Sequence, residues 1–415
     1  MLLYIDPGTG SMLFTILIGV LGTAAYKFKD TTVKVRFLLS GGKARTIDDK
    51  RAEYVIFSDH KRYWNVFEPI CDEFENREKE IIYMTASPDD PALDKPYNHV
   101  KCEFIGEGNK AFAALNILRA DIVLSTTPSL DVFYWKRSKH VNYYVHVPHA
   151  ASDLTMYRMF GIDFYDAILT SGDYHEEQIR ALEEARKLPP KEIVKAGLPF
   201  LDTMKERLES AGRVKNKKPK VLLAPSWGPS AIFSKYGGKI IDELLKTDYD
   251  IIIRPHPQSF TSEKDMIETL MKQYPASERI EWNRDNDNFE ALRRADVLIS
   301  DFSGVMFDFC LVFDKPLIYT DVEFDASPYD ACWLSEEPWT FRVLPKLGLK
   351  LTKENMHELG NLIERCLHDK SFDQGREEAR NETWAYIGES AGRITDYLIE
   401  KHKSMEANAQ GDKTE

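Results

Sequence analysis

The sequence predicts an α/β protein in which two Rossmann-like domains face each other across a cleft, preceded by a membrane segment. Short β-branched runs alternate with helical patterns from Tyr54 onward, which is typical of doubly wound sheets. The lysine-rich stretch 211–220 interrupts this alternation, and the same pattern then starts again. Because 415 residues can bury two large cores, we interpret the stretch as a linker between domains.

The composition is that of a globular protein, with 43% hydrophobic and 29% charged residues. A net charge of −12 argues against a nucleic-acid binder, which normally has a basic footprint. It leaves room for an anionic substrate, because a site can be locally basic in an acidic protein. The five cysteines are dispersed without a C-x-x-C pair, which indicates reduced thiols instead of a disulfide framework or a zinc site.

The apolar run 12–26 predicts an N-terminal membrane anchor, which we place at residues 1–29. The run is shorter than the ~20 residues of a full span, so a full span and a re-entrant or interfacial anchor both stay open. No basic region precedes it, which disfavours a cleaved signal peptide. Basic residues follow the run and are expected to hold the body of the protein on the cytoplasmic face of the cell membrane: Lys27, Lys29, Lys34 and Arg36.

The predicted elements fall into two sets. The first domain (30–210) is expected to contain strands at 54–57, 81–84, 101–105, 121–125, 142–146, 167–170 and 193–196, with helices at 109–119 and 174–186. The second domain (211–385) is expected to contain strands at 221–224, 251–254, 279–282, 296–300 and 316–319, with helices at 237–246, 263–273, 289–295 and 304–313. A helical region, 353–401, leads into a C-terminal helix and polar tail (386–415).

Ligands of open α/β sheets bind at the carboxyl ends of the strands, so residues just after each strand are the first candidates. The strand 296–300 runs into Asp301, Ser303 and Gly304 at the start of a helix. A hydroxyl and free backbone N–H groups at a helix N-terminus suit a phosphate, and glycine allows close approach. We predict that these three residues bind a phosphate-bearing donor substrate, with Asp308 as a further possibility. The alternative is that Ser303 acts only as a helix cap.

The strand 251–254 ends in Arg254, and His256 follows between two prolines. A guanidinium can fork onto a phosphate, and an imidazole can exchange a proton near neutral pH. The prolines stiffen the turn and keep both side chains directed to the strand end. We predict that Arg254 binds the donor and that His256 is catalytic, against the alternative of a structural pair.

Two histidines follow the strand 142–146. His149 lies in the loop, where its ring is free, and is our candidate general base for an acceptor hydroxyl; His146 is a possible substitute. No further cluster of cysteine, histidine or carboxylate completes a metal site with them. We therefore predict neither a metal nor a cofactor.

Ser226 and Trp227 follow the first strand of the second domain. Ser226 is a candidate contact to a donor phosphate or to the acceptor, and Trp227 is a possible stacking surface for a ring. The alternative for Trp227 is packing in the seam between the domains.

Together these motifs resemble the CDP-glycerol glycerophosphotransferase family, which has a GT-B-like fold. The resemblance rests on four elements in the family's order, and it covers most of the chain after about His140: GLPFLD at 197–202, APSW at 224–227, RPHP at 254–257, and DFSGVMFD at 301–308 followed by KPLIY at 315–319.

The resemblance implies a transferase that moves a glycerol-phosphate or related polyol-phosphate unit from a CDP-activated donor and releases CMP. Arg254, His256 and Ser303 would hold the diphosphate, and His149 would take the proton of the acceptor hydroxyl. The implied acceptor is a lipid-linked or cell-surface polymer, as in teichoic acid biosynthesis, and no nucleic acid is involved.

Three positions depart from the family pattern. Ala150 stands where glycine usually follows the histidine, Gly304 replaces a second serine, and Gly228 replaces an arginine. Two other functions therefore stay open. One is a GT-B glycosyltransferase that uses a UDP- or GDP-sugar for surface polysaccharide synthesis, and the other is a degenerate membrane scaffold that binds a nucleotide without turnover.

Overall fold

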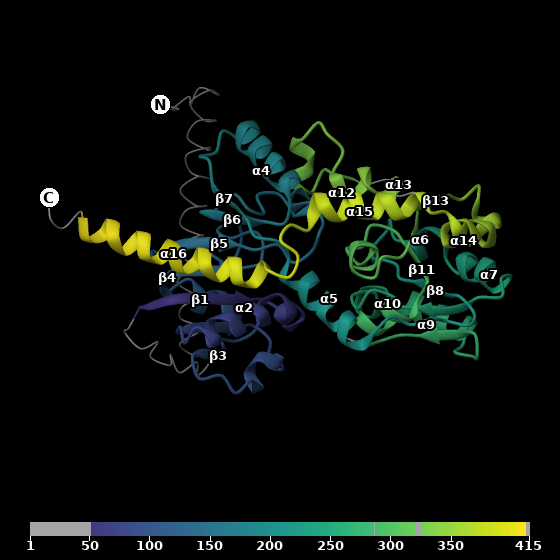
Figure 1. Cartoon of the computed structure of the whole chain (residues 1–415), viewed down its shortest axis with the longest axis horizontal. Helices are drawn as coiled ribbons and strands as arrows, with labels where there is room; N and C mark the ends of the chain where they lie inside the picture. The colour runs from purple at the N-terminus through teal and green to yellow at the C-terminus, as the bar shows by residue number, and fades with distance from the viewer. Residues whose placement is uncertain (1–50, 286, 321–324, 412–415) are drawn as a thin grey trace, which may run out of the picture.

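The computed structural model describes residues 51–285, 287–320 and 325–411, which form two α/β halves (Figure 1). The first half is built on a seven-stranded sheet and the second on a six-stranded sheet. All strand pairs that the structure describes in the two sheets are parallel. The predicted α/β class with two doubly wound sheets is confirmed.

The two sheets follow the same winding rule. The first has the order β3-β2-β1-β4-β5-β6-β7 and the second the order β10-β9-β8-β11-β12-β13. Each sheet therefore has a switch point, between β1 and β4 and between β8 and β11, where ligands of such folds bind. The strands are β1 (Ala52–Ser58), β2 (Ile81–Thr85), β3 (Val100–Phe104), β4 (Arg119–Ser125), β5 (His140–His146), β6 (Ala167–Thr170), β7 (Glu192–Lys195), β8 (Lys220–Leu223), β9 (Asp250–Ile253), β10 (Ile280–Trp282), β11 (Val297–Ser300), β12 (Leu317–Thr320) and β13 (Gly348–Leu351).

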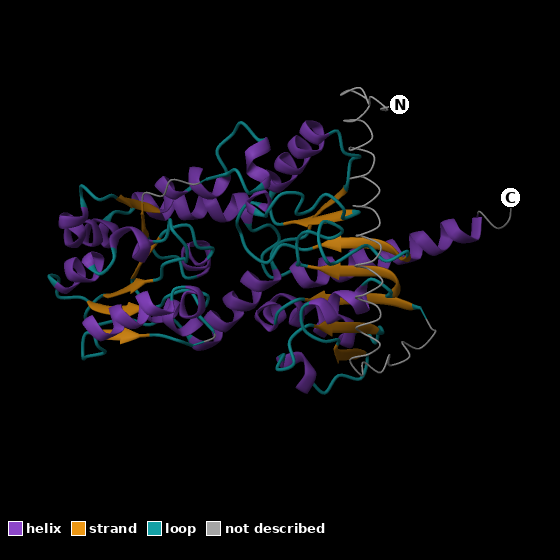
Figure 2. Ribbon diagram, turned by 180° about the vertical axis from the view of Figure 1, so that it is seen from behind, coloured by secondary structure: helices purple, strands orange, loops and turns teal. Residues whose placement is uncertain are grey.

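Helices connect the strands and cover the sheets, as the ribbon view from behind also shows (Figure 2). The α-helices are α2 (Trp64–Asn76), α3 (Asn109–Leu115), α4 (Asp173–Arg186), α5 (Pro199–Ala211), α6 (Ile232–Tyr236), α7 (Lys239–Leu245), α8 (Ser259–Ser262), α9 (Lys264–Gln273), α10 (Phe289–Arg294), α11 (Val305–Phe307), α12 (Trp339–Arg342), α13 (Leu344–Leu347), α14 (Leu359–His368), α15 (Ser371–Thr383) and α16 (Ser390–Gly411). The 3-10 turns are η1 (Lys61–Tyr63), η2 (Pro91–Asp94), η3 (Leu154–Met156), η5 (Asp330–Trp333) and η6 (Met356–Glu358), and η4 (Asp308–Val312) is a π-helical turn.

One predicted helix is shorter in the structure, and one strand of the structure was not predicted. The helix predicted at 109–119 ends at Leu115, because Leu118 is buried in the core and Arg119 already begins β4. The strand β13 was not predicted, since its four residues include a glycine and a lysine, which have low β propensity. The other predicted strands lie at β1 to β12, with ends that shift by a residue or two.

The C-terminal helix returns to the first half of the molecule. The chain passes from the first half to the second through α5, and after α15 it crosses back, so that α16 lies along α2 and β4 (Figure 1). On that face of the first sheet, Phe67 and Phe74 of α2 share a buried cluster with Ile394 and Leu398 of α16. Burial of this apolar surface attaches α16 to the first half.

Where the chain crosses between the halves, a buried carboxylate joins the two passages. Asp202 of α5 accepts hydrogen bonds from the Trp384 indole at 2.8 Å, the Gly388 amide at 2.8 Å and the Ser390 amide at 3.1 Å. Gly197 precedes α5 with φ +96°, and a Cβ there would lie 2.5 Å from the carbonyl oxygen of Ala385. The GLPFLD motif is therefore the junction of the two halves.

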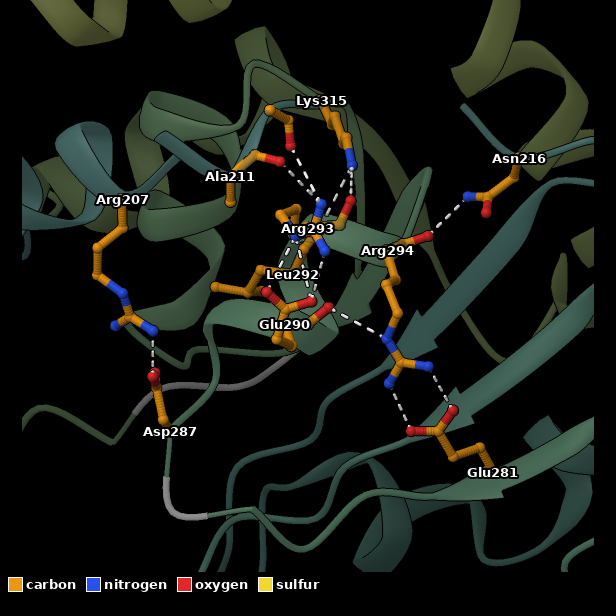
Figure 3. Close-up of polar contacts among 11 residues, drawn as sticks. Arg207, Ala211, Asn216, Glu281, Asp287, Glu290, Leu292, Arg293, Arg294 and Lys315 are labelled. Atoms are coloured by element: carbon orange, nitrogen blue, oxygen red, sulfur yellow. Dashed lines mark hydrogen bonds and ion pairs between the residues drawn. The ribbon is translucent and has the colours of Figure 1, made fainter. Parts of the chain in front are cut away.

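The predicted linker is fixed to the second half. Arg293 of α10 donates to the carbonyl oxygens of Ala211 and Gly212, at 3.5 and 3.2 Å, and Asn216 donates to that of Arg294 at 2.7 Å (Figure 3). These bonds satisfy backbone carbonyls at the end of α5 and of α10. The lysine-rich stretch thus continues the junction as an ordered connection.

The predicted membrane anchor lies outside the described residues, and it stays a prediction, as do the predicted domain limits. Among the residues that the structure describes, no helix has the length and apolar character needed to cross a bilayer.

The junction gives a stability prediction. Asp202→Ala removes the acceptor of three N–H groups, of which those of Trp384 and Ser390 are buried, and should lower the free energy of unfolding by about 3 kcal/mol. Glu209→Ala is the control, because Glu209 lies on the same helix but forms an exposed ion pair with Lys205, which is worth less than about 1 kcal/mol. Thermal unfolding of both variants measures the difference, and equal midpoints would contradict the role given to Asp202.

Candidate active site

A cavity of about 520 Å³ lies between the halves, at the carboxyl ends of the strands that form both switch points. The first half contributes residues that follow β1, β2 and β5, and α5 adds two more: Lys61, Arg62, Trp64, Asn65, Pro91, His149, Ala150, Phe200 and Arg207. The second half contributes residues that follow β8, β9, β10 and β11: Ala224, Pro225, Arg254, Pro255, His256, Pro257, Asp287, Asn288, Ser303, Gly304, Val305 and Asp308. The two halves therefore face each other across this cavity, as the predicted fold requires.

His149 is the histidine of the first half that lines the cavity. Its Nδ1 lies 2.9 Å from the Thr126 hydroxyl and 3.5 Å from the Tyr157 hydroxyl, and its ring packs on Tyr63 with 4.7 Å between centroids. Both described polar contacts fall on Nδ1, so a proton there can be donated to Thr126 while Nε2 keeps a lone pair. Burial, and then the charge of Arg62, lower the pKa of His149 to about 4. The imidazole is thus neutral at pH 7, as a general base must be.

His146, the possible substitute, does not line the cavity. It is fully buried at the end of β5, with its Nε2 3.3 Å from the Tyr157 hydroxyl. Its Nδ1 has no hydrogen-bond partner in the described part of the chain, and burial lowers its pKa to about 3. His146 therefore packs behind Tyr157, which in turn contacts His149. The difference arises because the His146 ring packs against Tyr157 and Tyr165 and does not extend past the strand end.

Arg254 and His256 lie in the cavity wall, as predicted. Arg254 is nearly buried, and its guanidinium donates to the Asn283 side chain. The Gln258 amide donates to Nδ1 of His256 at 3.1 Å, so the proton of the neutral ring is on Nε2, where it can be donated to a ligand oxygen. Burial, followed by the charges of Arg62 and Arg254, lowers the pKa of His256 and keeps it neutral near pH 7.

Ser303, Gly304 and Asp308 also line the cavity. The Ser303 hydroxyl accepts a weak hydrogen bond from the Val305 amide at 3.5 Å and lines the cavity, while Gly304 is the N-cap of the helical turn. Burial raises the pKa of Asp308 to about 7, and its carboxyl group accepts from Asn288 at 3.3 Å. Asp308 can therefore both donate to and accept from a hydroxyl or base of a ligand near neutral pH.

Two of the predicted donor contacts lie behind the cavity wall. The Asp301 carboxylate is buried and accepts from the backbone amides of Ser226 at 3.0 Å, Ile232 at 3.0 Å and Phe302 at 2.7 Å. Ser226 is itself buried, and neither residue lines the cavity. Asp301 therefore joins the loop after β8 to the loop after β11, so both residues position the site and do not line it.

Trp227 stands at the edge of this region. Its side chain is 47% exposed, and its ring centroid lies 6.5 Å from that of His256. It is therefore not packed in the seam between the halves, and its ring face is accessible. The next residue, Gly228, has φ +97°, a backbone conformation that an arginine would adopt only with strain.

The departures at Ala150 and Gly304 face each other across the cleft. A Cβ on Gly304 would lie 3.7 Å from the Cβ of Ala150, which is van der Waals contact. The two departures from the family pattern therefore lie on opposite walls of the cavity, at one place.

The sequence reasoning missed the loop after β1. Lys61, Arg62, Trp64 and Asn65 line the cavity, although none of them was a candidate. The signal was available, because the first strand of a doubly wound sheet borders its switch point. In the described residues, no three histidine, cysteine, aspartate or glutamate side chains gather as a metal site.

Comparison with known proteins identifies the family. The model of the family described as CDP-Glycerol:Poly(glycerophosphate) glycerophosphotransferase matches residues 44–400. The chain belongs to this family. The resemblance drawn from the four motifs is confirmed, and the chain is a CDP-glycerol glycerophosphotransferase-like transferase. A search of curated protein sequences gave no match.

Solved structures support a GT-B-like fold for this glycerophosphotransferase. The wall teichoic acid polymerase TagF is similar with a TM-score of 0.55 and 17% identity, over 92% of this chain and 99% of that chain. The UDP-GlcNAc 2-epimerase of Methanocaldococcus jannaschii is similar with a TM-score of 0.53 and 15% identity, over 84% of this chain and 99% of that chain. The MnaA structure from S. aureus has a TM-score of 0.56 and 13% identity, over 84% and 96%.

The environment of His149 predicts an unusual titration. The imidazole should remain neutral to about pH 5 and become protonated only near pH 4, because burial and the Arg62 charge oppose the cation. NMR titration of histidine-labelled protein, with His149→Gln to assign the signal, measures the midpoint. A midpoint near the ordinary value of 6.5 would contradict this environment.

Proposed function

We propose that this family member transfers a glycerol-phosphate unit, or a related polyol phosphate, from a CDP-activated donor to a hydroxyl group of a polymer acceptor at the membrane. The observation that carries the proposal is the cavity in which His149 of one half faces Arg254, His256 and Ser303 of the other. A TagF structure soaked with CDPG, similar over 92% of this chain, is consistent with this class of donor.

The second half provides the groups that hold the donor. Arg254 supplies a positive charge that cannot be lost, and the Nε2 proton of His256 and the hydroxyl of Ser303 supply neutral donors to the diphosphate. Trp227 offers an exposed ring beside His256 on which a base can stack. Asp308 is suited to hydroxyl groups of the donor, since its carboxyl group is half-protonated near pH 7.

The first half provides the base. The acceptor hydroxyl loses its proton to Nε2 of His149 as its oxygen bonds to the glycerol-bearing phosphorus. The bond from this phosphorus to the bridging oxygen of the diphosphate breaks, and that oxygen leaves with CMP. Positioning of the reactants and neutralisation of charge supply the rate enhancement, and the histidine remains available to return the proton to solvent.

Nucleotide sugars are the second class of donor. The UDP-GlcNAc 2-epimerases share the fold, so the fold alone does not separate a sugar nucleotide from a CDP-polyol. The family match favours the CDP-polyol. A degenerate nucleotide-binding scaffold is opposed by the presence of His149, Arg254, His256 and Ser303 together in one cavity.

A donor panel tests the proposal. Full-length protein in membranes is incubated with CDP-glycerol, CDP-ribitol, UDP-GlcNAc and GDP-mannose, and the released nucleotide is identified. We expect CMP from a CDP-polyol and neither UDP nor GDP. Release of UDP or GDP would identify a glycosyltransferase, and release of no nucleotide with retained binding would favour the scaffold.

Three variants locate the reaction in the cavity. His149→Ala should lower kcat by about 100-fold or more, with little change in donor affinity, because a general base contributes to the chemical step. His256→Ala and Ser303→Ala should lower both kcat and donor affinity. Unchanged turnover in all three would place the chemistry elsewhere, and a pure loss of donor affinity in His149→Ala would contradict its role as base.

We further propose that residues 1–29 attach the enzyme to the cytoplasmic face of the membrane, where the acceptor is lipid-linked. The apolar run 12–26 and its basic flank support this, and attachment raises the effective concentration of such an acceptor. Deletion of residues 1–29 should move the protein from the membrane fraction to the soluble fraction. It should also lower transfer to membrane acceptors more than transfer to a soluble polyol, both measured by the CMP released. Retention of the truncated protein in the membrane fraction would contradict this anchor.

A further inference from the structure

Arg62 differs from two other cations of the cavity, Lys61 and Arg207, which both pair with carboxylates. Lys61 pairs with Asp89, and Arg207 pairs with Asp287, as Figure 3 shows for the second pair. Arg62 forms no ion pair with any carboxylate in the described residues, and its guanidinium lies over the Tyr63 ring at 4.7 Å. An arginine that faces a cavity without a carboxylate partner is available to an anionic ligand.

Arg62 also lies near both candidate histidines, although they belong to different halves. The Tyr63 ring contacts both residues. Its centroid lies 4.7 Å from Cζ of Arg62 and 4.7 Å from the centroid of the His149 ring. Its charge lowers the pKa of His149 and, next after burial, that of His256. Arg62 therefore stands at the point where the reacting groups of the two halves meet.

We propose that Arg62 binds the phosphate that is transferred, by contacting its non-bridging oxygens from the side of the first half. Arg254 contacts the diphosphate from the second half, so the anion lies between one arginine of each half. The planar guanidinium matches two phosphate oxygens at once, and its charge stabilises the transition state as the bridging oxygen departs. This inference rests on the proposed donor, a nucleoside diphosphate ester.

The position of Arg62 in the chain supports this role. It belongs to η1, which follows β1 directly, and β1 borders the switch point of the first sheet. The Arg62 amide donates to the His60 ring at 3.1 Å, which fixes the backbone of the turn. The guanidinium lies over the Tyr63 ring and has no carboxylate partner in the described residues, so its charge is available to a phosphate.

The test compares two nucleotides that differ by the phosphate in question. CDP carries the second phosphate and CMP lacks it, so Arg62→Ala should weaken CDP binding by about 10-fold and leave CMP binding unchanged. With CDP-glycerol, kcat should fall by about 100-fold or more. Arg62→Lys keeps the charge but loses the forked donor geometry, so its CDP affinity and kcat should lie between those of the wild type and of Arg62→Ala.

Arg393→Ala is a matched control, because Arg393 is an arginine stacked on a tyrosine, Tyr386, at 3.5 Å, in α16 and outside the cavity. It should leave both affinities and kcat unchanged. Equal loss of CDP and CMP binding in Arg62→Ala, or no change in CDP binding and kcat, would overturn the inference.

Pyrophosphate binding separates this inference from the choice of donor. If the wild-type protein does not turn over CDP-glycerol but binds pyrophosphate, and Arg62→Ala weakens that binding, the donor is wrong and the phosphate contact stands. If pyrophosphate binding is equal in the two proteins, Arg62 is not a phosphate contact, whatever the donor.

Discussion

The hydrogen bonds of Asp202 are the contacts on which the site depends most. The chain passes between the halves twice, through α5 and again between α15 and α16, and this carboxylate bonds the second passage to the first. His149 lies in one half, and Arg254, His256 and Ser303 lie in the other. Because transfer between groups on opposite walls depends on their separation to about 1 Å, the junction sets the reaction geometry although it lies outside the cavity.

A second buried carboxylate does the same within the second half. Asp301 joins the loops after β8 and β11 across the switch point, so that Ser303 and Gly304 face the cavity. Gly304 faces Ala150 of the first half, and a Cβ at position 304 would lie 3.7 Å from that of Ala150. Two departures from the family pattern thus meet at one place, on opposite walls of the cleft.

Much of this arrangement could be predicted from the sequence, since the positions of the strands and their ends follow from periodicity. Arg254, His256 and Ser303 were found because residues that follow parallel strands gather at one edge of a sheet. The direction of a side chain at that edge could not be read, which is why Asp301, Ser226 and His146 were expected in the cavity and lie behind its wall. Arg62 was missed because the loop after β1 carries no motif, although its place beside the switch point was a sufficient reason to consider it.

The electrostatics of the cavity divide the chemistry between two kinds of residue. Burial and neighbouring arginines lower the pKa of His149 and of His256, so neither ring holds a positive charge at neutral pH. A protein with a net charge of −12 must then attract a diphosphate by groups that do not lose their charge, and Arg62 and Arg254 meet that requirement. The same arginines that attract the anion keep the histidines neutral, and a neutral histidine is the form that can accept a proton from a hydroxyl group. Anion binding and proton transfer are therefore coupled through the same charges.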